Sequence, residues 1–128
     1  MEEIRSDELL FFQGRENALP LYLSLREKLE TCQPLKIQVK KTQISLIRRR
    51  LFGAVSFTPV RKAKERPAVW LTLTIGLGRR LDSPRIDAAV EPYPGRWTHH
   101  VMVGCEKEID NELICWLREA ADFSANKK

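Results

Sequence analysis

The chain has 128 residues, of which 43% are apolar and 30% charged, with a formal net charge of +5 at neutral pH. This length suits one domain with a single hydrophobic core, and the composition excludes global disorder. No apolar run approaches the ~18 residues that span a bilayer, and the acidic start Met1-Glu2-Glu3 disfavours a secretion signal. We therefore expect a cytoplasmic domain over residues 1–128, with a core at about 6–122, short flexible ends and no membrane partner.

Two helices are predicted at the N-terminal end. Ser6-Asp7-Glu8 supplies a cap and first-turn acids for a short helix that Gly14 ends. Asn17 can cap a second helix, which tolerates Pro20 in its first turn. Side chains then recur at spacings of three and four residues, which indicates an amphipathic helix closed by Pro34; they are Leu19, Tyr22, Leu23, Arg26 and Leu29.

The hydrophobic period changes from 3.6 to two residues after Pro34. Alternation predicts five strands, at about 36–40, 43–49, 52–58, 69–75 and 97–103. Pro59 and Pro67 bracket the basic residues 61–66, which we interpret as a turn. Glycines and prolines predict an irregular stretch from 76 to 96.

A helix is predicted at the C-terminal end, where Asp110 is the N-cap and Ile109 meets Ile114 as a hydrophobic staple. Its buried stripe is Leu113, Trp116, Leu117 and Ala120. Helices at both ends of a run of strands predict an α+β two-layer sandwich. It would have about five mainly antiparallel strands, N-terminal helices, one C-terminal amphipathic helix and a sheet face partly open to water.

No metal and no cofactor are expected. The three cysteines, Cys32, Cys105 and Cys115, form no C-x-x-C motif, and we interpret them as free thiols that behave as small buried apolar residues. Acidic side chains gather before the last helix, at Glu106, Glu108, Asp110 and Glu112. A helix start that complements the helix dipole explains the last two of these more simply than a weak cation site.

Positive charge is concentrated in one segment. Residues 36–66 hold ten Lys or Arg and one acid, a net charge of +9, whereas the other 97 residues sum to −4. Clustered like charges attract anions. The candidate anion-binding residues are Lys36, Lys40, Lys41, Arg48, Arg49, Arg61, Lys62 and Lys64. The alternative is a solvated basic face and turn that keep a sheet edge soluble.

Trp70 is the candidate for stacking. Strand alternation places it on the polar sheet face with Lys36, Lys40 and Arg49. Cations around an aromatic ring have the chemistry of a platform for single-stranded nucleic acid, on which a base stacks while phosphates meet the cations. The alternative places Trp70 in the core beneath the first helix.

His99 is the one candidate for catalysis. It cannot readily chelate a metal together with its neighbour His100, because adjacent residues of a strand point to opposite faces. His99 shares a face with Trp97, so we expect a core-edge imidazole held by a hydrogen bond. The alternative is a general base that works with Asp82 or Glu91 in a small hydrolase.

Several motifs resemble a bacterial protein family. They are Lys41-Thr42-Gln43-Ile44-Ser45 with Arg48 and Phe52, Leu73–Gly78 with Leu81–Arg85, and Thr98-His99 with residues 109–120. As a set, over residues 6–122, they resemble the domain of unknown function numbered fifty-six fifty-five, sometimes labelled "predicted transport protein". The family is similar in architecture to YdhG-like and frataxin-like small domains, which implies an α+β fold and no particular activity. Where the family often has an aromatic residue after the Lys-Thr pair, this chain has Gln43.

The residues predict an uncharacterised, non-enzymatic binding domain. Its partner would be nucleic acid or a phosphorylated ligand, bound through the basic sheet face and the 61–66 turn. Two alternatives stay open. One is an interaction subunit in which residues 52–57 form an exposed edge that pairs across a two-fold axis, so that the protein is a monomer or a homodimer. The other is a small hydrolase that uses His99.

Overall fold

Three helices and six strands make up the fold in a computed structural model that describes residues 5–126. The helices are α1 (Ser6–Phe11), α2 (Leu19–Cys32) and α3 (Asn111–Ala125), and the short 3-10 turns are η1 (Glu16–Ala18), η2 (Ala63–Glu65) and η3 (Glu106–Glu108). The strands are β1 (Lys36–Val39), β2 (Gln43–Ile47), β3 (Leu51–Ser56), β4 (Leu71–Leu77), β5 (Ala88–Tyr93) and β6 (Arg96–Val103). They form one antiparallel sheet in the order β1-β2-β3-β4-β6-β5.

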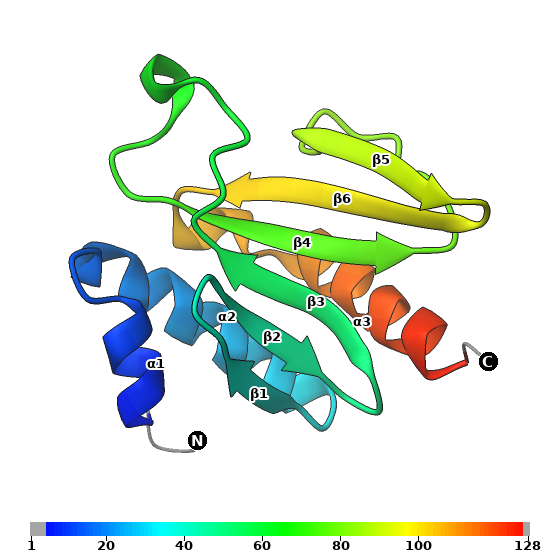
Figure 1. The fold of residues 1–128 in the computed structure, drawn as a ribbon, viewed down its shortest axis with the longest axis horizontal. Helices are drawn as coiled ribbons and strands as arrows, with labels where there is room; N and C mark the ends of the chain where they lie inside the picture. The colour runs from blue at the N-terminus through cyan, green and yellow to red at the C-terminus, as the bar shows by residue number, and fades with distance from the viewer. Residues whose placement is uncertain (1–4, 127–128) are drawn as a thin grey trace.

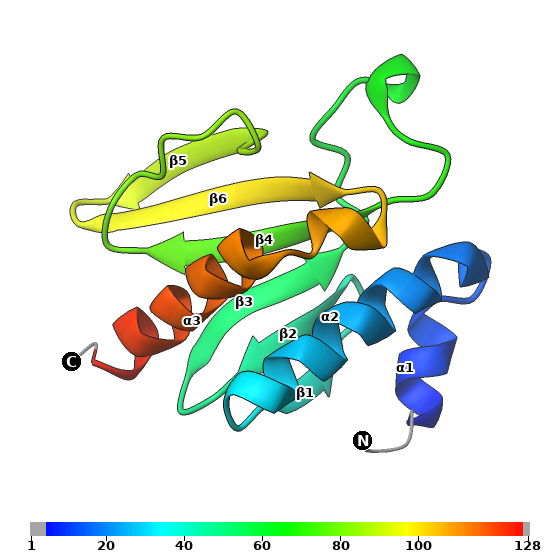
Figure 2. The same cartoon turned by 180° about the vertical axis from the view of Figure 1, so that it is seen from behind.

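The sheet carries helices on one face, which confirms the predicted α+β class. Figure 2 shows α2 and α3 lying across that face, while α1 lies at the side next to the start of α2. The strands' alternate side chains and the apolar stripes of the helices form the buried core. Its centre includes Leu25 and Leu29 of α2, Leu71, Leu73, Ile75 and Leu77 of β4, and Leu113 and Leu117 of α3. Each fully buried Leu or Ile contributes about 1.5–3 kcal/mol of transfer free energy.

The opposite face of the sheet is polar and largely uncharged. Cross-strand pairs align two rows of side chains on it: Ser45, Ala54, Thr74, His100 and Ala88, and then Gln43, Ser56, Thr72 and Met102. Thr72, Thr74 and His100 lie on this face, as predicted. Of the cations of residues 36–66, only Lys36 lies within a strand, β1, whereas the others lie in turns and connections.

The strand β3 lies inside the sheet, between β2 and β4. The expectation that residues 52–57 form an exposed edge is therefore wrong, and the edges are β1 and β5. The sixth strand, β5, was not predicted, because Ala88-Ala89-Val90 does not alternate and Pro92 interrupts the pattern. Proline is tolerated there because one side of an edge strand needs no ladder hydrogen bond.

Several local predictions about helix ends are settled by the structure. The Asp110 carboxylate caps α3 by accepting a hydrogen bond from the Leu113 N–H at 3.0 Å, as predicted. The expected cap at Asn17 is wrong, because this residue lies inside η1. Helix α3 continues past the predicted core limit of 122, to Ala125. Residues 1–4 and 127–128, where flexible ends were expected, lie outside the described part of the chain.

The cysteines are free thiols, as predicted, but all three are exposed, so their expected burial is wrong. Cys32 ends α2 and Cys115 lies on the solvent side of α3, where no core position is available. Among residues 5–126, no helix is long and apolar enough to cross a membrane.

Candidate anion-binding site

The predicted anion-binding residues separate to two ends of the sheet. The five residues of β2, roughly 17 Å of extended chain, lie between the turn with Lys40 and Lys41 and the turn with Arg48 and Arg49. Arg48 is held by Asp122 at 2.7 Å, so it is not a free cation. Lys40, Lys41 and Arg49 are exposed and form no ion pair with a carboxylate of the described residues.

The long connection from β3 to β4 carries the rest of the predicted cations. Figure 1 shows it extending beyond the end of the sheet, with η2 at its tip. Arg61 anchors this connection, because its Nε donates to Asp87 at 2.7 Å and the other oxygen of Asp87 accepts from the Met102 N–H at 2.7 Å. Asp87 also raises the pKa of Arg61. Lys62 and Lys64 are exposed on the same connection.

Trp70 lies directly before β4 and is half-buried, so neither predicted environment describes it fully. Its ring packs edge-on against Phe57, with centroids 5.8 Å apart. Phe57 in turn stacks on Phe11 at 5.8 Å and meets the buried Phe12 edge-on at 5.6 Å. Trp70 is thus the outer member of an aromatic row that begins in the core, and its cationic neighbours are not the predicted Lys36, Lys40 and Arg49.

Two arginines lie over these rings. The Arg15 guanidinium is 4.3 Å from the Phe57 centroid and 5.5 Å from the Trp70 centroid, and Arg66 is 5.5 Å from the Trp70 centroid. Cations at such distances are attracted by the ring quadrupole. The Nε of Arg66 is buried and has no hydrogen-bond partner among residues 5–126.

The turn between α1 and α2 sets the position of Arg15. Gly14 has φ +83°, a conformation that favours glycine, and its N–H donates to the Glu16 carboxylate at 2.7 Å. That hydrogen bond lowers the pKa of Glu16. The Arg15 N–H donates to the carbonyl of Phe12 at 2.8 Å, which ties the turn to a buried residue. The sequence therefore folds locally so that an exposed arginine stands over the aromatic row.

Two hollows adjoin Arg15 and share Phe57 as part of their lining. One, of about 330 Å³, is lined by Phe11, Gln13, Arg15, Lys41, Thr42, Phe57 and Thr58. The other, of about 290 Å³, is lined by Gly14, Arg15, Asn17, Ala18, Phe57, Arg66, Ala68 and Trp70. We call the group of Arg15, Lys41, Phe57, Arg66 and Trp70 the arginine–aromatic site. Its three cations come from three different connections and form no ion pair with a carboxylate of residues 5–126.

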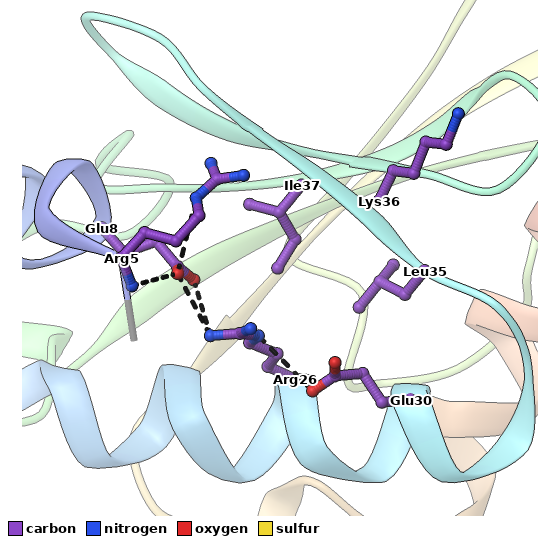
Figure 3. A pocket seen from close by; sticks show the side chains of 7 residues that line it. All are labelled: Arg5, Glu8, Arg26, Glu30, Leu35, Lys36 and Ile37. Atoms are coloured by element: carbon purple, nitrogen blue, oxygen red, sulfur yellow. Dashed lines mark hydrogen bonds and ion pairs between the residues drawn. The ribbon is translucent and has the colours of Figure 1, made fainter. Parts of the chain in front are cut away.

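A further cavity, of about 350 Å³, lies between α1, α2 and β1 (Figure 3). At its base the carboxylate of Glu8, which has no exposed surface, accepts hydrogen bonds from the Tyr22 hydroxyl, from Arg26 Nη1 at 3.1 and 3.2 Å and from the Arg5 N–H at 2.9 Å. Arg26 Nε lies 3.4 Å from Glu30. Both oxygens of Glu8 are engaged, so this network suits structural support rather than proton transfer.

The same network changes the chemistry of Tyr22. Burial raises the pKa of the Tyr22 phenol far above its ordinary value, and the hydrogen bond to Glu8 raises it further. The phenol therefore stays protonated and keeps donating to the carboxylate. Lys36, one of the predicted anion-binding residues, lines this cavity, and its side chain points away from the network in Figure 3.

His99 is completely buried, with both ring nitrogens engaged. Its Nε2 accepts from the Leu81 N–H at 2.9 Å, and its Nδ1 donates to the Ile75 carbonyl at 3.2 Å. Burial lowers its pKa, so the imidazole is neutral at pH 7. The prediction of a hydrogen-bonded core histidine is confirmed. Because no ring nitrogen is free to take a proton, the geometry gives no support to the hydrolase that would use His99 with Asp82 or Glu91.

Three of the four acidic side chains near the start of α3 are held by other groups of the protein. Asp110 and Glu112 hold Arg85 at 2.8 and 3.0 Å, and Glu108 accepts from the Gly104 N–H at 2.7 Å. Among the described residues, no group of three His, Cys, Asp or Glu side chains is arranged to hold a metal ion.

The comparison with protein families decides where this chain belongs. Residues 10–124 match the family described as a domain of unknown function, DUF5655. The chain is a member of the DUF5655 family. This confirms the family that the sequence motifs indicated. Searches of curated proteins and of solved structures gave no significant match.

The DUF5655 match covers the whole arginine–aromatic site. Of the residues predicted to bind anions or to stack, this site contains Lys41 and Trp70. Sequence reasoning missed Arg15, which lies outside the basic segment, and Arg66, which was counted in that segment but not proposed for binding. The nearest sequence signal was the aromatic pair Phe57 and Trp70 at the two ends of the long β3–β4 connection.

Proposed function

We propose that this DUF5655 domain is a binding module for an anionic, phosphate-bearing partner, which it holds at the arginine–aromatic site. The observation that supports the proposal is the meeting of Arg15, Lys41 and Arg66 around two adjoining hollows, without a carboxylate partner among residues 5–126. Positive charges that gather at a concave, partly apolar surface raise the local potential and draw anions to it.

Several other arginines of the domain do not offer such a surface, because carboxylates already hold them. Arg79 forms a bidentate pair with Glu119 at 2.9 Å, and Arg85 lies between Asp110 and Glu112. An incoming phosphate would have to displace these acids. At the arginine–aromatic site it meets cations that the described part of the protein leaves without a counter-charge.

The test is a fluorescence-anisotropy titration of the full chain with a short labelled oligonucleotide, competed by unlabelled inorganic polyphosphate. Binding should weaken as salt rises from about 50 to about 200 mM, because neutralised phosphates release counterions. Lys41→Ala and Arg66→Ala should each weaken binding and reduce the slope of log affinity against log salt by about 0.7–0.9.

The matched control is Arg50→Ala. Arg50 is also exposed, but it lies in the turn at the opposite end of β2. Its removal should leave the salt slope unchanged. No salt-sensitive binding to either polyanion, or an equal loss for Arg50→Ala and Lys41→Ala, would overturn the proposal.

A further inference from the structure

We infer that the partner is single-stranded nucleic acid and that one of its bases stacks on the guanidinium plane of Arg15. This inference rests on the proposed function, since it names the partner of that same site. It differs from the expectation that Trp70 is itself the stacking platform.

Arg15 is the most exposed of the planar side chains that carry the inference. Phe57 and Trp70 are both half-buried, and each has an arginine over its ring. Arg15, by contrast, is exposed, and its guanidinium lies 4.3 Å from the Phe57 centroid. That distance leaves no room for water between the guanidinium and the Phe57 ring, while the Arg15 side chain as a whole stays exposed. Guanidinium planes, like aromatic rings, accept stacked bases.

Each of the two hollows contains a second cation besides Arg15. Lys41 lines one hollow and Arg66 lines the other. A nucleotide inside a strand has a phosphate on each side of its base. Three cations spread over two adjoining hollows therefore suit a chain of nucleotides better than an isolated phosphate.

Stacking on Arg15 favours a single-stranded partner over a duplex. A base can reach Arg15 only when it is unpaired and turned outward, because a duplex keeps its bases stacked inside. The hollows also carry neutral polar side chains, Gln13, Thr42 and Asn17, which can donate to and accept from base edges. A phosphopeptide would use the cations but would leave the plane of Arg15 unused.

Arg15→Lys tests this directly, since lysine keeps the charge but has no plane on which a base can stack. Affinity is measured for a single-stranded oligonucleotide, for the duplex of the same sequence and for inorganic polyphosphate. Arg15→Lys should weaken single-strand binding by about 5- to 150-fold, the range of one lost base stack. Its affinity for polyphosphate should change less than about twofold, because the charge is retained. The wild type should prefer the single strand to the duplex.

Arg50→Lys is the matched control and should bind all three probes as the wild type does. Arg15 is exposed, so its replacement opens no cavity, and a thermal melt of Arg15→Lys should overlay that of the wild type.

The outcomes separate this inference from the proposed function. Salt-sensitive binding in which Arg15→Lys weakens no probe, or weakens polyphosphate as much as the single strand, would overturn stacking on Arg15 and leave anion binding in place. Equal or tighter binding of the duplex, or of a phosphopeptide of the same charge, would overturn the single-stranded partner. Failure of all probes to bind would overturn the proposed function itself.

Discussion

Removal of the Glu8 carboxylate should destabilise the domain strongly. Glu8 is completely buried and neutralises Arg26, which is 4% exposed. Truncating one partner of a buried ion pair costs about 3–5 kcal/mol, because the other charge stays buried without compensation. In Glu8→Ala, Arg26 would still have Glu30 at 3.4 Å. We therefore expect the loss of folding free energy to lie near the lower end of this range, at about 3 kcal/mol.

Such a loss is a large share of the ~5–15 kcal/mol that stabilises a typical domain. For a chain of this length, 1 kcal/mol corresponds to roughly 3–5 °C in Tm, so Glu8→Ala should melt about 10–15 °C below the wild type. Glu8→Gln should lose less, because the amide keeps the volume and one acceptor oxygen. Circular dichroism during heating, together with urea unfolding, measures both variants.

Asp7→Ala is the control, because Asp7 is the preceding residue and also pairs with an arginine, Arg5 at 3.1 Å. The Asp7 side chain is 52% exposed, so its pair should contribute less than about 1 kcal/mol. If Glu8→Ala lost no more stability than Asp7→Ala, the network of Glu8, Tyr22 and Arg26 would not be a structural support.

Two further predictions concern pH and the β3–β4 connection. Burial lowers the pKa of His99 and of His100, so below about pH 6.5 the unfolded chain binds more protons and stability is lost as the pH falls. The Tm of the wild type should therefore fall as the pH is lowered from about 7.5 to about 5.5, and the fall should be smaller in His100→Gln. A wild-type Tm that does not change over this range would contradict the prediction. Asp87→Asn should loosen the connection that Arg61 anchors, so that trypsin cleaves after Lys62 and Lys64 several-fold faster, as mass spectrometry would show. The control Asp82→Asn, the same change at an exposed residue outside the connection, should be cleaved at the wild-type rate.

The fold was predictable where local pattern and tertiary position agree. The segment that became β4 alternates apolar and polar residues because one face meets the helices and the other does not. Asp110 was predictable as a cap because capping depends on a few neighbouring residues. The strand β5 was not predictable from the sequence. An edge strand needs neither strict alternation nor a backbone N–H at every position, and Pro92 in the sequence indicates the end of a strand.

The candidate site was less predictable, because it depends on which connections meet at one end of the sheet. Charge density drew attention to residues 36–66, but neutralisation by distant acids removed Arg48 and Arg61 from the free cations. Nothing local in the sequence shows that Arg15 stands over Phe57. Glu8 was expected to be an ordinary first-turn acid, and it is buried because Tyr22 and Arg26, 14 and 18 residues later, turn toward it.

Trp70 is half-buried, so its environment lies between the two that the sequence suggested, an exposed sheet face and the core. The aromatic row runs from Phe12, which is completely buried, through Phe57 to Trp70, so its inner end belongs to the core while its outer end supports arginines. A change at Phe57 or Trp70 therefore alters stability and the cation positions together, and neither effect can be read alone. Arg15 touches the row only from outside, so its plane and its charge can be changed while the core stays as it is. A substitution of Arg15 therefore changes binding without changing the stability of the fold. For this reason Arg15, rather than Trp70, is the position at which the function of the domain is best tested.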